Sequence, residues 1–342
     1  MFKTEKMKLR NILIPGLTMV LLILPSCHHK SSDSSSYSYL SGSLSYSIPT
    51  YIFPGDEFIL TPSGVTNPTA GTLGYYWYSS WDTARDTTKT ETGSGDGSWD
   101  VIVPEEIGSY TITGVAYATG YYTSSTTKTI YVVDPTVNVS LTGAGYQTDS
   151  TTLVDTRDGG TYYLASTDGS TWTQNNLYYT NSGASYENSP AIDAIYGRLY
   201  TWTEAMEACP DGWHLPSDAE FAALAGAYVE GSSFKAGETF YGAAGVLMAD
   251  AYFLGSKMWT FWPEVKINNN SKFSAIPVGY AIDQEGSLRF QGNNSYAVFW
   301  TSDEDEDGDL GVYRYIYVDK NNVYMAMGDK DSFRASVRCV KD

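Results

Sequence analysis

The sequence predicts a mainly β protein with a small α+β part, and its length and composition lead to that prediction. The chain has 342 residues, a length that suits two domains or one large one. Hydrophobic residues make up 42% of the chain, which is enough to build cores and excludes global disorder. Only 18% of the residues are charged, whereas Gly (32) and Tyr (29) are abundant. This balance is typical of secreted β-rich proteins with many turns.

The net charge excludes one class of partner. The chain carries 21 basic and 39 acidic side chains, a formal net charge of −18. Nucleic-acid binding depends on Lys and Arg contacts to phosphates, so we expect no nucleic-acid partner.

The first thirty residues predict export and a membrane anchor. Basic residues precede an apolar stretch, residues 12–24, which is broken by a Pro-Gly pair and is too short for a comfortable transmembrane span. This is the pattern of a secretory signal peptide, assigned to residues 1–26. The stretch ends in Leu-Pro-Ser-Cys and resembles the bacterial lipobox, in which the Cys is lipidated. We therefore expect lipidation of Cys27 and stable membrane attachment. An ordinary cleaved signal with an incidental Cys is the alternative.

A Ser-rich run, residues 27–47, follows the predicted anchor and has the composition of a flexible tether. We expect an outer-membrane lipoprotein of the cell envelope. Some Bacteroidetes lipoproteins carry an acidic run after the lipidated Cys that marks export to the cell surface. That run is nearly absent here, so the sequence leaves surface and periplasmic orientation open.

Residues 48–134 predict a β-sandwich. Short alternating runs are separated by Gly, Pro, Asn and Asp turns about every ten residues. The Gly-Ser-Tyr sequence ending at Tyr110 resembles a late-strand corner of PKD-like and other bacterial Ig-like domains, and Trp77 is placed where such domains bury an aromatic residue. We expect an Ig-like spacer held by packing alone. Residues 135–150 are predicted to be a linker, because Pro135 pushes the residue before it to extended geometry.

Residues 151–342 carry a series of short motifs. In order they are DTRDGGTYY at 155, WTQNNL at 172, GRLYTW at 197, ACPDGWHLPSDAEF at 208, FSAIPVGY at 273, FWTS at 299 and SVRCVKD at 336. Together they resemble the Fibrobacter succinogenes major paralogous domain, which is common in lipoproteins of Fibrobacter and Bacteroidetes. The resemblance implies a C-type-lectin-like α+β domain, related in fold to the sulfatase-modifying-factor group.

Two short helices are predicted near the start of this domain. Ser217 with Glu220 three positions later forms a capping box, and apolar residues then recur at helical spacing, which predicts a helix over residues 218–228. A preceding helix over residues 203–208 is predicted to be capped by Thr203. Strands and turns follow.

The cysteine count predicts a disulfide. The chain has three cysteines, and lipidation of Cys27 leaves Cys209 and Cys339 in an oxidising compartment. The loop that they would close covers most of the second domain, which corresponds to about 4–5 kcal/mol of stabilisation. A reactive-thiol role is the alternative.

An acidic run is a candidate calcium loop. Its sequence, DEDEDGDL from residue 303, places six carboxylates around a Gly turn, four of them at alternating positions as hard cations prefer. The candidate ligands are Asp303, Asp305, Asp307 and Asp309. The twelfth position is Arg314 rather than the bidentate Glu of known loops. A hairpin tip without a bound ion is the alternative, and no other cofactor is indicated.

Aromatic residues crowd the second half of the domain and suggest a ligand-binding surface. The candidates for stacking on a ligand are Trp262, Trp300, Tyr313 and Tyr315. Burial of these rings in a β-domain core is the competing interpretation.

The chain offers few candidates for catalysis. His214 is the only histidine outside the tether, and we find no metalloprotease, nucleophile-elbow or phosphate-loop motif. We therefore expect a non-catalytic binding or adhesion protein that recognises a carbohydrate or cell-surface ligand. One alternative is a structural or fimbria-associated envelope component that binds a protein. Another is an enzyme related to the sulfatase-modifying factors.

Overall fold

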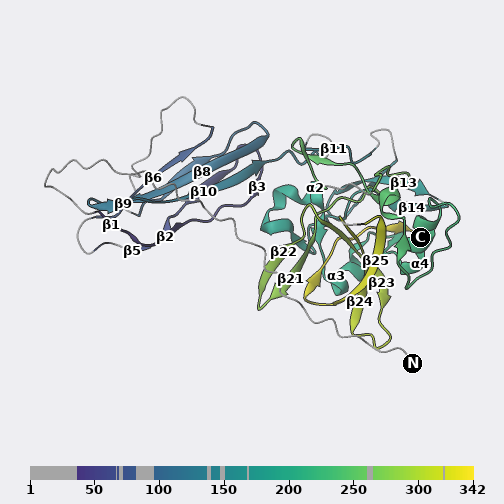
Figure 1. The fold of residues 1–342 in the computed structure, drawn as a ribbon. Helices are drawn as coiled ribbons and strands as arrows, with labels where there is room; N and C mark the ends of the chain where they lie inside the picture. The colour runs from purple at the N-terminus through teal and green to yellow at the C-terminus, as the bar shows by residue number, and fades with distance from the viewer. Residues whose placement is uncertain are drawn as a thin grey trace, which may run out of the picture. The chain divides into compact units, whose positions relative to one another are not determined.

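The computed structural model describes residues 37–342, apart from residues 67, 69–71, 82–95, 137–139, 147–150, 168, 260–264 and 319. The predicted signal peptide, the lipidation site Cys27, residues 28–36 of the Ser-rich tether and the candidate Trp262 lie outside the described residues. The prediction of a mainly β protein is confirmed (Figure 1). Within the described residues, every helix is too short or too polar to cross a membrane.

The described residues of the first part of the chain, up to Val133, form ten strands. They are β1 (Ser38–Tyr39), β2 (Ser41–Ser45), β3 (Tyr51–Ile52), β4 (Glu57–Leu60), β5 (Ser63–Thr66), β6 (Gly74–Ser79), β7 (Trp99–Ile102), β8 (Gly108–Tyr117), β9 (Tyr121–Tyr122) and β10 (Ser124–Val132). One sheet has the order β3-β10-β8-β6, and β4–β7, β2–β5 and β1–β9 form separate pairs. Side chains of the four-stranded sheet and of the β4–β7 pair share one buried core, so this part has two packed layers.

The folded region begins earlier than the predicted end of the tether at residue 47. Strands β1 and β2 lie within the Ser-rich run, and Leu44 is 3% exposed. Tyr46 is also buried, and its hydroxyl donates to the carbonyl of Ile112 at 2.6 Å. Two apolar side chains thus hold this end of the run in the core, although its composition is that of a flexible spacer.

Trp77 is buried in this core, as the sequence predicts. Its indole is 1% exposed and donates a hydrogen bond to the carbonyl of Gly97 at 2.9 Å. At the position of the predicted corner, the Tyr110 hydroxyl donates to the carbonyl of Glu106 at 2.9 Å. A hydroxyl bonded to the backbone a few residues upstream fixes the path of the chain into β8.

The second part combines short helices with several sheets. Its strands are β11 (Leu141–Thr142), β12 (Thr152–Val154), β13 (Thr161–Thr167), β14 (Ser170–Thr173), β15 (Ala184–Ser185), β16 (Arg198–Leu199), β17 (Trp213–His214), β18 (Phe240–Tyr241), β19 (Tyr252–Phe253), β20 (Ser256–Lys257), β21 (Tyr280–Gln284), β22 (Ser287–Gln291), β23 (Tyr296–Glu304), β24 (Leu310–Tyr317), β25 (Asn322–Asp329), β26 (Phe333–Arg334) and β27 (Val340–Lys341). Its helices are η1 (Tyr186–Asn188), η2 (Pro190–Ile192), α2 (Asp193–Tyr196), α3 (Trp202–Ala208), α4 (Asp218–Gly226) and α5 (Ala244–Leu247).

Three sheets of this second part position the features discussed below. They have the orders β12-β13-β14-β27-β17, β18-β25-β24-β23 and β22-β21-β26. In addition, β11 pairs with β19, so the segment predicted as a linker contributes a strand to the second part.

The two predicted helices are present, with one change in capping. Helix α4 begins at the capping box of Ser217 and Glu220, as expected. Helix α3 is capped by Thr201 rather than by the predicted Thr203, because Thr201 is extended and exchanges hydrogen bonds with Glu204. The hydroxyl of Thr203 instead donates to Asp331 at 3.0 Å.

The predicted disulfide between Cys209 and Cys339 is confirmed. The bond joins the end of α3 to the segment that precedes β27, over a sequence separation of 130 residues. By loop-closure entropy a bridge of this span stabilises the folded chain by about 5 kcal/mol.

A buried arginine connects three of the sequence motifs. The guanidinium of Arg338 donates to Oδ1 of Asn176 at 2.7 Å, to the carbonyl of Thr173 at 3.1 Å and to the carbonyls of Phe273 and Ser274. It also lies over the ring of Phe273, 4.4 Å from the centroid. Its partners are all neutral oxygens, and burial lowers the pKa of Arg338 to about 10. The buried positive charge of Arg338 is therefore tolerated only because these oxygen atoms are placed to accept its hydrogen bonds.

Replacing Arg338 with Met should destabilise the fold strongly. The variant leaves the carbonyls and the Asn176 oxygen buried without a donor, so we expect a loss of about 3 kcal/mol or more in the free energy of unfolding. Urea denaturation measures the loss, and Arg289→Met on the exposed side of β22 is the control, with a change below about 0.5 kcal/mol. Equal midpoints for the two variants would contradict the central role of Arg338.

His214 should make stability depend on pH. Partial burial disfavours the charged ring, but hydrogen bonds to Asp342 (2.7 Å) and Glu220 (2.9 Å) outweigh that effect, so the pKa of His214 is raised above 6.5. A raised pKa in the folded state contributes stability that is complete below the unfolded value of 6.5 and is lost as the pH rises through the folded value.

We expect His214→Gln to remove this part of the pH dependence. The effect stays below about 1 kcal/mol, because 42% of the side chain is exposed and solvent screens the pairs. Urea midpoints of the wild type and the variant, compared from acidic to alkaline pH, measure it. Parallel curves for the two proteins would show that His214 contributes nothing.

Candidate functional site

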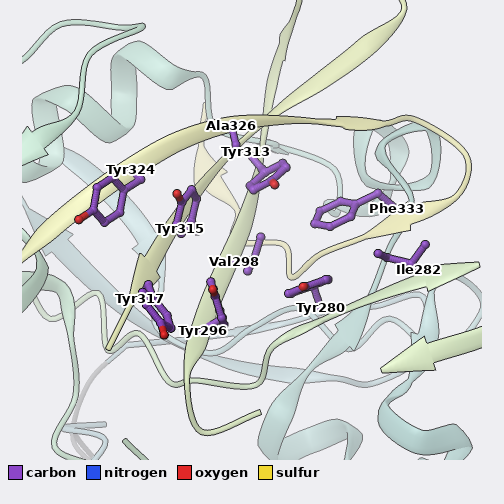
Figure 2. Close-up of a pocket in the computed structure, with 10 residues that line it drawn as sticks. All are labelled: Tyr280, Ile282, Tyr296, Val298, Tyr313, Tyr315, Tyr317, Tyr324, Ala326 and Phe333. Carbon is purple, nitrogen blue, oxygen red and sulfur yellow. The ribbon is translucent and has the colours of Figure 1, made fainter. Parts of the chain in front are cut away.

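An uncharged groove lies on the face of the β23–β24–β25 sheet. It has a volume of about 650 Å³ and is called the tyrosine groove below. Ten side chains line it: Tyr280, Ile282, Tyr296, Val298, Tyr313, Tyr315, Tyr317, Tyr324, Ala326 and Phe333 (Figure 2). Strands β21 and β26 contribute three of them, and the rest come from β23, β24 and β25.

The alternation of side chains along β24 explains why the groove forms here. Tyr313, Tyr315 and Tyr317 point to the groove, whereas the intervening side chains are buried on the other face. Successive residues of a strand face opposite sides of the sheet. One strand therefore supplies both the core and a row of three tyrosines.

Small residues on the neighbouring strands create the hollow. Tyr315 lies opposite Val298 on β23 and Tyr324 on β25, whereas Tyr313 lies opposite Ala326 on β25. Val298 and Ala326 do not fill the space that a large side chain would occupy at these two positions. The hollow consequently has an apolar floor between aromatic walls (Figure 2).

The aromatic walls are held by stacking. Phe333 lies between Tyr313 and Tyr280, with ring centroids 4.8 Å and 5.4 Å apart. Two further stacked pairs are Tyr296 with Tyr317, at 4.5 Å, and Tyr315 with Tyr324, at 5.1 Å. Each such pair contributes about 0.5–1.5 kcal/mol beyond the burial of area, so the ring positions are fixed without a ligand.

The groove offers neutral hydroxyl groups. The hydroxyl of Tyr280 donates to Oε1 of Gln291 at 3.2 Å, and that of Tyr324 accepts from Nδ2 of Asn322 at 3.2 Å. Burial and the neighbouring tyrosines raise the pKa of Tyr313 to about 12. Burial also raises the pKa of Tyr280. Both groups stay protonated at neutral pH, so the walls combine apolar rings with uncharged donors.

The structure places some of the predicted aromatic candidates in the groove and another in the core. Tyr313 and Tyr315 line the groove, but Trp300 is 0% exposed and cannot stack on a ligand. Tyr313 and Phe333 cover the Trp300 ring edge-on, with centroids at 5.7 Å and 5.4 Å, and its N–H donates to the carbonyl of Tyr200. Trp300 therefore packs beneath the rings of Tyr313 and Phe333 and holds these two groove residues in place.

Sequence reasoning missed Tyr296, Tyr324 and Phe333 as site residues. Because side chains alternate between the two faces of a strand, the sequence pattern of β23 and β25 could have indicated which face of its strand each of the two tyrosines occupies. Phe333 carries no such signal, since its strand β26 has only two residues and pairs with β21.

The four aspartates of the acidic hairpin do not share one site. Asp303 accepts from the backbone N–H of Asp218 at the start of α4, and Asp305 accepts from that of Leu310. Within the described part of the chain, no group of three or more His, Cys, Asp or Glu side chains is arranged to hold a metal ion. Arg314, at the twelfth position of the loop, pairs with buried Asp218.

A lysine provides the positive charge at this hairpin. The ammonium group of Lys330 lies 2.5 Å from Oε2 of Glu304 and 2.5 Å from the carbonyl of Gly308. It also lies 4.2 Å from the ring centroid of Trp202. A carboxylate and a carbonyl oxygen are typical cation ligands, and here both bind a side chain of the same protein.

His214 and the two predicted disulfide cysteines lie outside the tyrosine groove. Both ring nitrogens of His214 are paired, with Asp342 and Glu220, so the ring joins β17 and the end of the chain to α4. Cys209 and Cys339 are bonded to each other and present no free thiol. None of these groups is placed to act on a ligand in the groove.

Calcium should not stabilise this protein if Lys330 supplies the cation of the hairpin. A ligand that binds only the folded state raises its stability in proportion to the logarithm of ligand concentration. We expect thermal melting in calcium and in a chelator to coincide. A rise of Tm with calcium that disappears in Asp303→Ala/Asp305→Ala would contradict this expectation and restore the calcium loop.

The comparisons with solved structures are distant. Two structures of the superoxide reductase neelaredoxin from Ignicoccus hospitalis are each 14% identical to this chain, with TM-scores of 0.21 and 0.20. The alignments cover 27% and 30% of this chain and 82% and 87% of those chains. The Yersinia pseudotuberculosis adhesin InvE is 9% identical with a TM-score of 0.26, over 89% of this chain and 70% of the adhesin. TM-scores this low carry no argument about fold or function.

The family comparison is specific. No curated protein sequence matches the chain. A model of the Fibrobacter succinogenes major domain matches residues 153–341, which is more than half of the chain and includes every strand of the tyrosine groove. The matched range also contains the motifs from residue 155 onward that suggested this resemblance, except for the last residue, Asp342. The chain belongs to the Fibrobacter succinogenes major domain family.

Proposed function

We propose that this protein is a non-catalytic, membrane-anchored binding protein that recognises a neutral carbohydrate in the tyrosine groove. The observation that carries the proposal is the groove itself, a preformed hollow whose described lining residues include six tyrosines and no charged side chain. Its volume of about 650 Å³ falls within the range of small-molecule and cofactor sites.

The chemistry of the lining favours a sugar. A sugar ring presents C–H groups on its faces and hydroxyls around its edge. Aromatic rings with attached hydroxyls match both features, because Tyr has an apolar body and a polar tip. The chain's net charge of −18 favours a neutral glycan over an anionic one, and so does the absence of basic side chains among the described residues that line the groove.

The first part of the chain suits the role of a spacer. The described chain enters it at β1, where Tyr39 lies beside Tyr122, just before the start of β10. It leaves at Val133, just after the other end of β10. The nine residues of β10 span roughly 30 Å at 3.3 Å per residue, so entry and exit lie at opposite ends of the sheet. A lipid at Cys27 and the Ser-rich residues before β1 would complete the attachment to the outer membrane.

A protein partner is the second candidate. Tyrosine is also enriched at protein interfaces, where stacked rings supply rigid contact area at low entropic cost. The same stacked pairs that favour a sugar could therefore contact a peptide or a structural component of the envelope. An enzymatic role through a thiol pair has less support, since Cys209 and Cys339 form a disulfide.

A glycan array tests the carbohydrate proposal. The full-length protein in detergent should bind neutral glycans, with equal signal in calcium and in a chelator. Tyr315→Ala and Tyr324→Ala should each weaken binding about tenfold or more, because both remove an aromatic wall of the groove.

Tyr78→Ala is the matched control. Tyr78 is 39% exposed on β6, in the first part of the chain and outside the groove. Binding that is unchanged in all three variants would place the glycan site elsewhere. No binding across a broad array would refute the carbohydrate proposal, and a search for protein partners with the same variants would follow.

A further inference from the structure

The residues at the floor of the tyrosine groove restrict the kind of ligand group that can enter it. Val298 lies at the bottom, 2% exposed, and Figure 2 shows it surrounded by aromatic rings. The rings nearest to it in that view belong to Tyr280, Tyr296, Tyr313, Tyr315 and Phe333. The other two aliphatic lining side chains, Ile282 and Ala326, are also apolar. The hollow thus has an apolar bottom, with its polar groups on the phenol rings of the walls.

This arrangement discriminates between groups that enter the hollow. A hydroxyl placed on an apolar floor loses its hydrogen bonds to water and gains no replacement, which is unfavourable. A methyl group in the same place gains the free energy of burying apolar area. The tyrosine hydroxyls remain available to bond polar atoms next to the methyl group.

On the basis of the proposed function, we infer that the recognised sugar carries a methyl group and inserts it over Val298. Two kinds of neutral sugar share this chemistry. N-acetylated hexosamines have a methyl at the end of an amide, and 6-deoxyhexoses have a methyl on the ring. The described groove residues carry no charge and are compatible with both kinds of sugar. The titration described next distinguishes the two.

Calorimetric titration of the full-length protein with matched sugar pairs tests the inference. One pair is N-acetylglucosamine and glucose, and the other is L-fucose and L-galactose, which differ only at carbon 6. We expect the methyl-bearing member of at least one pair to bind about tenfold more tightly, because a methyl group gains from burial on the apolar floor whereas a hydroxyl there loses its hydrogen bonds to water. Preference in the first pair identifies the acetamido group as the source, and preference in the second identifies the deoxy sugar.

The outcomes separate this inference from the proposed function. If sugars bind but neither pair shows a preference, the methyl inference is wrong and carbohydrate recognition stands. If neither these sugars nor any glycan on the array binds, both are wrong. Array hits that all lack a methyl group would also overturn the inference.

A substitution at the floor provides a second test. Val298→Leu fills the hollow, so it should reduce the ratio of the affinity for the methyl-bearing sugar to that for the matched sugar. Val323→Leu is the control, since Val323 is equally buried at 2% but lies on β25 among core residues rather than groove-lining ones. An unchanged preference in folded Val298→Leu, verified by its Tm, would contradict the inference.

Discussion

The buried guanidinium of Arg338 is the contact on which the second part of the structure most depends. A charge in the interior is stable only where enough oxygen atoms surround it. Here they come from the WTQNNL segment and from the FSAIPVG segment, about 100 residues apart in the sequence. The disulfide at the next residue, Cys339, holds the same segment to α3. The hydrogen bonds of Arg338 and the disulfide of Cys339 thus hold the same segment in place, and the sheets pack around this segment.

The sheet that carries the groove serves two purposes at once. On its inner face Arg314 forms a buried ion pair with Asp218 at the start of α4, lies over the ring of Phe240 and donates to the carbonyl of Glu238. On its outer face the alternate residues of β24 are tyrosines that stack with those of β23 and β25. A rigid inner face keeps the outer rings in place. The groove is therefore formed before a ligand arrives, which lowers the entropic cost of binding.

Local patterns predicted the features that depend on neighbouring residues. The capping box of Ser217 and Glu220 specified where α4 begins, and the small number of cysteines specified the disulfide. The predicted cap of α3 at Thr203 was wrong, although the same capping-box pattern distinguishes it from Thr201. Only Thr201 has Glu204 three positions later, as the capping box requires. The acidic hairpin shows a different limit, since Lys330, which neutralises Glu304, follows that residue by 26 positions.

The sequence by itself determined the mainly β architecture, the family, the disulfide and the row of tyrosines on one face of β24. These properties follow from composition, short motifs and the two-residue period of a strand. Only the tertiary structure decided which aromatic residues reach solvent. Trp300 shares the groove face of its sheet with Tyr313, yet Phe333 from β26 covers it and leaves Tyr313 partly exposed. The packing of one strand over another has no local signature, because it depends on residues that are distant in the chain.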